Sequence, residues 1–335
     1  MTKNVFIILR TWIADYLITA RTVFLSALVF SCHEPDEAPV SLRWVPSEFA
    51  RYGSGFFSFR TGEDNSLYTV GFVDNEFGVH KAVNGNLYEP IVKLDFPAIA
   101  VQDFAVFKQT VYLLFEKKLW KVNGAITEEI NFGSAITAEL ISGVYHLNGE
   151  LLVAGKFKDG MNNRYGMVYS DDGEAFKPVQ PVEGAFDTPG WFSIRESDRV
   201  FLTGSNSHQY EYDRGVLGRI EYSHSFLAVD SNNNFFSLDR GADGTQQIMK
   251  WTNGMTTKLG EPFSQQYKIY NILLKDDHII ATGDNSTTGI SISYFFDGND
   301  WIPIPTTNYF FGVFKHNGGI FGYTVDGIIA ELVYG

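Results

Sequence analysis

Residues 291–303, SISYFFDGNDWIP, decide the fold of this chain. An apolar run leads into Asp297-Gly298, and the chain resumes with Trp301-Ile302-Pro303. Asp-Gly is a strong short-range signal for a β-hairpin, because its tight turn requires residues that tolerate positive φ. Proline has no N–H to donate to a sheet, so Pro303 places the second strand at an edge. The stretch predicts the two outermost strands of a small antiparallel sheet.

This pattern repeats along the chain in two interleaved series of turns. The first series falls at Asn65, Gln109, Gly149, Asp198, Asn233, Asp277 and Gly318. The second falls at Asn84-Gly85, Asn123-Gly124, Asp172-Gly173, Gly215, Asn253-Gly254 and Asp297-Gly298. Successive turns of the first series lie 35 to 49 residues apart, about 42 on average. That period is typical of a four-stranded propeller blade.

The motif aromatic-x-Pro indicates how the ring closes. It follows turns of the second series as Tyr88-Glu89-Pro90, Phe176-Lys177-Pro178 and Trp301-Ile302-Pro303. The last repeat has no second-series turn, but Trp44-Val45-Pro46 near the other end of the chain matches the motif. We therefore expect residues 40–50 to supply the outer strand of the last blade, because a ring of sheets needs a device that leaves no open edge.

The prediction is an all-β chain that forms one seven-bladed β-propeller over residues 40–335, with no competing helical period. The expected blades are 55–94, 95–134, 135–182, 183–223, 224–263, 264–306, and 307–335 joined by 40–50. Six or eight blades remain possible if turns are misassigned.

Composition limits the function classes. The net charge of −13 argues against nucleic-acid binding, which needs an excess of Lys and Arg. A single cysteine excludes an internal disulfide framework and a cysteine-rich zinc site. Aromatic residues make up 16% of the chain, which suits many short strands.

The N-terminal segment has the features of a targeting signal. An apolar run over residues 22–31 is too short to span a bilayer and ends at Cys32, the only cysteine, after which 33–39 is acidic and carries two prolines. Val29-Phe30-Ser31-Cys32 resembles the lipobox of bacterial lipoproteins, and the bulky Phe30 departs from that pattern. The resemblance implies a signal peptide at 1–31, lipidation of Cys32, an acidic tether at 32–39, and a place in the cell envelope, at the outer membrane or cell surface. The alternatives are an ordinary signal peptide with an incidental cysteine, or a misassigned start codon.

A second resemblance concerns one turn. Residues 169–176, YSDDGEAF, resemble a degenerate Asp-box, the turn motif of sialidase-type propellers, with Phe176 in place of the usual Trp. In that family the box lies between the third and fourth strands of a blade and far from the active site. The resemblance supports the fold and implies no catalytic residue.

The connections between blades carry the candidate binding residues. They are expected near the mouth of the central funnel, where propellers usually bind ligands: Arg51, Tyr52, Gln102, Asp103, Glu139, Asp187, Trp191, His224, Tyr267, Lys268, Asn308 and Tyr309. Exposed aromatic rings beside carboxylates and amides suit a glycan or a partner protein. For each single aromatic, the alternative is packing between blades.

Catalysis and cofactors find little support in the sequence. The alternative to a binding protein is a glycan-active propeller enzyme, in which Asp103 and either Glu139 or Asp187 would form a carboxylate pair across the funnel. The histidines form no HExxH motif or close pair, so we expect no cofactor and no metal. Calcium at the turns around Asp284-Asn285 or 297–300 is the alternative, although turn chemistry explains those residues equally well.

Overall fold

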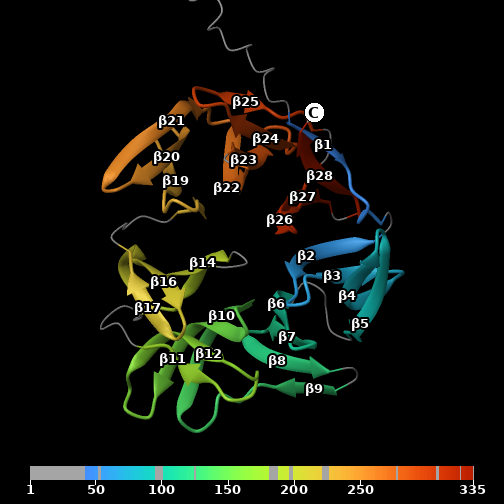
Figure 1. The fold of residues 1–335 in the computed structure, drawn as a ribbon, viewed down its shortest axis with the longest axis vertical. Coiled ribbons are helices and arrows are strands. Elements are labelled where there is room, and N and C mark those ends of the chain that lie inside the picture. Colours follow the sequence, from blue (N-terminus) through green and yellow to red (C-terminus); the bar gives the residue numbers. More distant parts are fainter. Residues whose placement is uncertain are drawn as a thin grey trace, which may run out of the picture. The chain divides into compact units, whose positions relative to one another are not determined.

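The computed structural model describes residues 42–51, 54–94, 101–123, 126–180, 188–195, 199–220, 226–276, 278–306, 309–324 and 326–334. Within this part of the chain, strands form seven four-stranded antiparallel sheets arranged in a ring (Figure 1). Leu42–Tyr334 forms one compact unit. The prediction of a seven-bladed β-propeller is confirmed.

The first four blades follow the chain in order. Blade 1 contains β2 (Gly55–Thr61), β3 (Leu67–Val73), β4 (Glu76–Asn84) and β5 (Leu87–Lys93). Blade 2 contains β6 (Val101–Phe107), β7 (Thr110–Phe115), β8 (Lys118–Asn123) and β9 (Ile126–Glu129). Blade 3 contains β10 (Ile136–Leu147), β11 (Glu150–Asp159), β12 (Arg164–Ser170) and β13 (Lys177–Pro178). Blade 4 contains β14 (Trp191–Arg195), β15 (Val200–Thr203), the short 3-10 helix η2 (Ser205–Ser207), β16 (Gln209–Asp213) and β17 (Val216–Arg219).

The last three blades complete the ring. Blade 5 contains β18 (Ala228–Val229), β19 (Phe235–Arg240), β20 (Gln246–Thr252) and β21 (Met255–Phe263). Blade 6 contains β22 (Tyr267–Lys275), β23 (His278–Asn285), β24 (Ser291–Phe296) and β25 (Trp301–Pro303). Blade 7 contains β26 (Gly312–His316), β27 (Gly319–Tyr323), β28 (Ile329–Tyr334) and, as its outermost strand, β1 (Leu42–Pro46).

Strand β1 closes the ring as the sequence predicts. It pairs antiparallel with β28, from Leu42 opposite Tyr334 to Pro46 opposite Ala330. Proline also stands in the outermost strand of four further blades, as Pro90, Pro178, Pro262 and Pro303. These strands need no ladder donor on their outer side, which is why proline is tolerated there.

The turns are those of the two predicted series. Asn65 and Gln109 adopt positive φ between the first and second strands of their blades. Asn253 and Gly254 both have positive φ, as a two-residue hairpin turn requires. The turn at Asp297 differs, because Asp297 keeps negative φ and its carboxylate instead accepts the backbone N–H groups of Asn299 and Asp300, each at 2.8 Å. Asp198, Asp277 and Gly124 lie outside the described residues.

The core is divided among the blade interfaces. Seven clusters of buried apolar side chains occur in the described part of the chain, one between each pair of neighbouring blades. Between blades 4 and 5, for example, Phe201 packs against Phe226 and Phe235. Each sheet is therefore buried by its neighbours in the ring, and stability depends on the ring being complete.

The pairing of β1 leads to a test of closure. A chain of residues 47–335 lacks β1 and exposes the edge of β28, together with the apolar surface that Leu42 and Trp44 cover. We expect it to lose more than about 3 kcal/mol of unfolding free energy relative to residues 42–335, because a single buried leucine side chain already contributes about 2–5 kcal/mol. Urea unfolding followed by tryptophan fluorescence measures both chains, and equal midpoints would contradict the closing role of β1.

Candidate functional site

The antiparallel topology gives the ring two chemically different ends. At the entry end each innermost strand begins, as at Trp191, and the second strand turns into the third, as at Asp74-Asn75. At the hairpin end lie the turns of the two predicted series, such as Asn148-Gly149 and Asn253-Gly254. The twist of each sheet rotates the outer strands away from the direction of the innermost one, so the distinction is sharpest near the ring axis.

Exposed aromatic side chains gather at the entry end. Five of the exposed aromatic residues lie there: Phe72, Trp191, Tyr270, Tyr309 and Phe311. Trp191 and Tyr309 are 51% and 57% exposed, although aromatic rings of this size are usually covered. At the hairpin end, Tyr334 is the one exposed aromatic residue among those described. Apolar surface left in water at one end of a fold is typical of a binding face.

Of the residues expected at the funnel mouth, Trp191, Tyr309 and Lys268 are exposed at the entry end. Tyr267 is half-buried and packs against Tyr294, with ring centroids 6.0 Å apart, so it contributes to the wall of blade 6. Gln102 is exposed, and its Oε1 accepts the Lys117 backbone N–H at 3.0 Å. Tyr52, Asp187, His224 and Asn308 lie outside the described residues, as does Cys32.

Arg51 and Glu139 are both held in ion pairs. Arg51 Nη2 donates to both carboxylate oxygens of Asp74 at 2.6 Å, and the hydrogen bond with Arg51 lowers the pKa of Asp74. Glu139 contacts Lys158 and, at 3.1 Å, Lys156, both on the adjacent strand β11. Hydrogen bonds from Lys158 and then Lys156 lower the pKa of Glu139. In this arrangement Arg51 and Glu139 are already partnered by the protein.

Asp103 connects three consecutive innermost strands. It lies on β6 and is 7% exposed, and its Oδ1 accepts Arg60 Nη2 from β2 at 2.7 Å. Its Oδ2 accepts the backbone N–H of Val144 from β10 at 3.1 Å. A carboxylate buried in this way fixes the spacing of blades 1, 2 and 3 around the axis.

The sequence analysis does not predict three of the exposed aromatic residues at the entry end: Phe72, Tyr270 and Phe311. Tyr270 is the extra residue of a β-bulge, because the register of β22 on β23 shifts between Ile269 and Asn271. A bulge re-aims the side chain that it inserts, so simple alternation along the strand gives the wrong face. The signal available in the sequence is the pair of polar or aromatic residues, Tyr270-Asn271, between two buried isoleucines.

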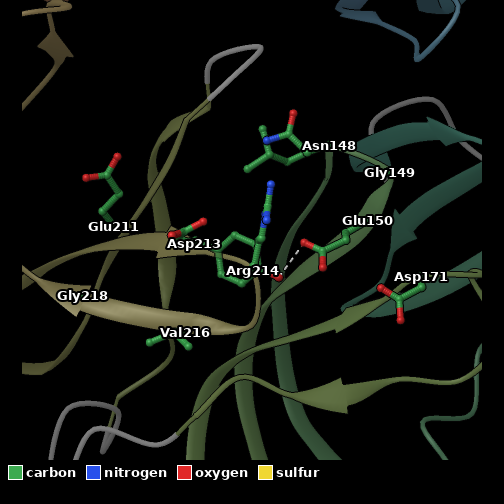
Figure 2. Close-up of a pocket in the computed structure, with 11 residues that line it drawn as sticks. Asn148, Gly149, Glu150, Asp171, Glu211, Asp213, Arg214, Val216 and Gly218 are labelled. Carbon is green, nitrogen blue, oxygen red and sulfur yellow. Dashed lines mark hydrogen bonds between the residues drawn. The ribbon is translucent and has the colours of Figure 1, made fainter.

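A groove lies at the hairpin end, between blades 3 and 4 (Figure 2). Its volume is about 900 Å³, and its charged lining consists of Glu150, Asp171, Glu211, Asp213 and Arg214. In the view of Figure 2 the Arg214 side chain lies between the carboxylates of Asp213 and Glu150.

Several of these groove carboxylates are already engaged. Glu150 accepts the Tyr212 hydroxyl at 2.8 Å, Glu211 pairs with Arg199 at 2.7 Å, and Asp171 pairs with Lys177 at 2.7 Å. In the described residues, no group of three or more His, Cys, Asp or Glu side chains is placed to hold a metal ion. The described part of the chain also contains no helix that is long and apolar enough to cross a membrane.

Comparisons with known proteins find similar solved structures at TM-scores below 0.5. No protein-family model matches the sequence, and no curated protein sequence matches it. Among solved structures, the extracellular domain of a hybrid two-component system from B. thetaiotaomicron is similar at a TM-score of 0.48 and 12% identity, over 88% of this chain and 42% of that one. A GH74 xyloglucanase from Xanthomonas campestris is similar at 0.48 and 14% identity, over 87% and 53%. The N-terminal domain of Nup159 is similar at 0.42 and 10% identity, over 90% and 97%. The chain spans about half the length, or less, of the first two proteins.

The Asp103 ion pair can be tested by substitution. In Asp103→Asn the Arg60 guanidinium loses its counter-charge in a mostly buried position, and we expect about 2–3 kcal/mol of destabilisation in urea unfolding. Glu139→Gln is the matched control, because its ion pairs are solvent-screened surface contacts and should contribute much less. Equal losses in the two variants would show that Asp103 does not hold the inner strands together.

Proposed function

We propose that this chain is an extracytoplasmic binding protein, anchored to a membrane, whose entry end binds a glycan. One observation carries the proposal: the exposed aromatic side chains, Trp191 and Tyr309 foremost, are concentrated at that end of the ring. Flat apolar rings stack on the C–H faces of sugars, and Lys268, exposed at the same end of the ring, supplies polar contacts. A rigid scaffold holds these groups in place, which lowers the entropic cost of binding.

Binding is favoured over glycan hydrolysis by the state of the carboxylates. A glycosidase needs two carboxyl groups facing the scissile bond, one of them with a raised pKa. Asp103 is buried in its contact with Arg60, and Glu139 pairs with two lysines. Among the described carboxyl groups whose pKa is resolved, such as Asp64, Asp159 and Asp172, each pKa is lowered. These groups suit structure better than proton donation.

The anchor is the second part of the proposal. Residues 1–31 act as the signal peptide, Cys32 carries the lipid, and residues 32–39 are an acidic tether to the propeller. The support is the sequence pattern: an apolar run too short to span a bilayer, a lipobox-like Val29-Phe30-Ser31-Cys32, and a charged, proline-containing stretch after it. The protein would then stand at the bacterial cell envelope, at the outer membrane or cell surface.

A glycan array probed with residues 39–335 tests the binding face. We expect specific binding that weakens about tenfold or more in Trp191→Ala and in Tyr309→Ala, because each removes a stacking ring worth about 0.5–1.5 kcal/mol beyond its buried area. Tyr334→Ala removes an exposed ring at the hairpin end and should bind normally. A blank array would contradict the glycan ligand and leave a partner protein, to be sought by cross-linking in native membranes.

The anchor has an independent test. In a bacterial host that processes lipoproteins, Cys32→Ala should move the chain from the membrane fraction to the soluble fraction and abolish labelling with radioactive palmitate. Ser31→Ala keeps a small residue before Cys32 and should remain membrane-bound. Membrane association without acyl labelling of the parent chain would refute lipidation.

A further inference from the structure

A second pocket lies at the hairpin end of the ring, away from the aromatic face. It has a volume of about 380 Å³ and is lined by residues from blades 4, 5, 6 and 7, mainly from their first hairpins. We propose that it is a binding site for a small organic anion, one that carries a carboxylate or phosphate group on a compact carbon body. The inference is separate from the glycan proposal, because it concerns other residues and the other end of the propeller.

The charge of the pocket is opposite to that of the chain. Six charged residues line it: Arg199, Lys250, Lys275, Lys315, Asp230 and Asp276. Arg199 is neutralised by Glu211, with which it pairs at 2.7 Å. The positive charge offered to a ligand is therefore that of Lys250 and Lys275, in a protein whose net charge is −13. Cations gathered in a concave site with low-dielectric walls raise the local concentration of anions.

Both carboxylates of the pocket are occupied by neutral donors. Asp230 accepts the backbone N–H groups of Asn232 and Asn234 at 2.9 and 2.8 Å, and the Asn234 Nδ2 at 2.6 Å. Asp276 accepts the Tyr334 hydroxyl at 3.2 Å. Asp230 is thus hydrogen-bonded within its own turn, and Asp276 is hydrogen-bonded to a tyrosine. In the part of the chain that the structure describes, neither carboxylate forms an ion pair with a lysine of the pocket.

Two of the lysines lack a counter-ion. Lys275 Nζ donates to the backbone oxygen of Leu332 at 2.8 Å, and Lys250 Nζ lies 5.9 Å from the ring centroid of Phe236. Among the described residues, no carboxylate oxygen lies within 4.0 Å of either ammonium group. Both side chains are half-buried, so part of their hydration is lost without an ion pair to replace it. A bound anion would supply that missing partner.

The other walls of the pocket are apolar and set the kind of anion. Val229, Phe236, Leu274 and Ile279 line it beside the cations. Small-molecule sites are typically about 300–1,000 Å³, mostly apolar, with a few polar groups that orient the ligand. A compact acid such as a uronate or a sugar phosphate can pair its anionic group with the lysines and pack its carbon body against the apolar walls. A neutral sugar can pack against the walls but has no charge to pair with the lysines.

Isothermal titration of the full chain with glucuronate, with glucose 1-phosphate and with glucose tests the proposal. We expect at least one of the two anions to bind and glucose not to bind; which anion binds identifies the carboxylate or the phosphate as the preferred group. Lys250→Gln should weaken anion binding about tenfold or more. Lys258→Gln is the matched control, because it removes the same charge from an exposed position on β21 of the same blade. Its affinity should stay within about twofold of the parent chain.

Amine-reactive footprinting gives a readout that does not depend on a variant. Glucuronate or glucose 1-phosphate at saturation should protect Lys250 and Lys275 from acetylation and leave Lys258 reactive, as measured by mass spectrometry. The proposal is overturned if neither anion binds, if glucose binds as well as the anions, if Lys258→Gln weakens binding as much as Lys250→Gln, or if bound anion protects neither Lys250 nor Lys275.

Discussion

The pairing of β1 with β28 is the interaction on which the rest of the ring depends. Each blade buries the faces of its sheet against two neighbours, so a chain of blades with two free ends would expose apolar surface at both. Building blade 7 from both ends of the propeller removes this problem, because Leu42 and Trp44 of β1 complete the interface between blades 6 and 7. Five backbone-paired positions thereby connect a strand at residue 42 to one at residue 334 and make the seven interfaces cooperative.

The aromatic residue of the aromatic-x-Pro motif has a second role that the turn pattern alone does not reveal. Trp44 Nε1 donates to Ser293 of blade 6 at 3.2 Å, and Trp301 Nε1 donates to the backbone oxygen of Leu259 of blade 5 at 2.9 Å. Phe176 of blade 3 packs against Phe132, which follows blade 2, with ring centroids 4.9 Å apart. Each ring reaches back to the preceding blade, while the proline two positions on keeps the strand at the edge. One short motif therefore terminates a sheet and attaches it to its neighbour.

The sequence predicts what depends on local chemistry and misses what depends on register. Turn residues such as Asn253-Gly254 and edge prolines such as Pro303 specify their own backbone conformations, and with them the number and order of the blades. The exposure of Tyr270 follows from a bulge whose position is fixed by pairing with β23, a long-range contact. The burial of Asp103 likewise depends on Arg60, 43 residues away on another blade. The sequence is enough to name side chains at the funnel mouth. It does not predict which residues they contact, because those contacts form between blades that only the closed ring brings together.

The two ends of the ring differ because they are built from different kinds of connection. The hairpin end consists of tight turns, which favour Asn, Asp and Gly and therefore bring charged and polar groups together near the axis. The entry end receives the longer connections between blades, which are free of turn constraints and can present large rings such as Tyr309 and Phe311 to solvent. Lys250 and Lys275 stand at the end where turn carboxylates are abundant, yet Asp230 is directed to its own turn. The hydrogen bonds of the turn hold the Asp230 carboxylate away from ion pairing with the lysines. Within the described ranges, Lys250 and Lys275 therefore stay without a counter-ion in an acidic protein.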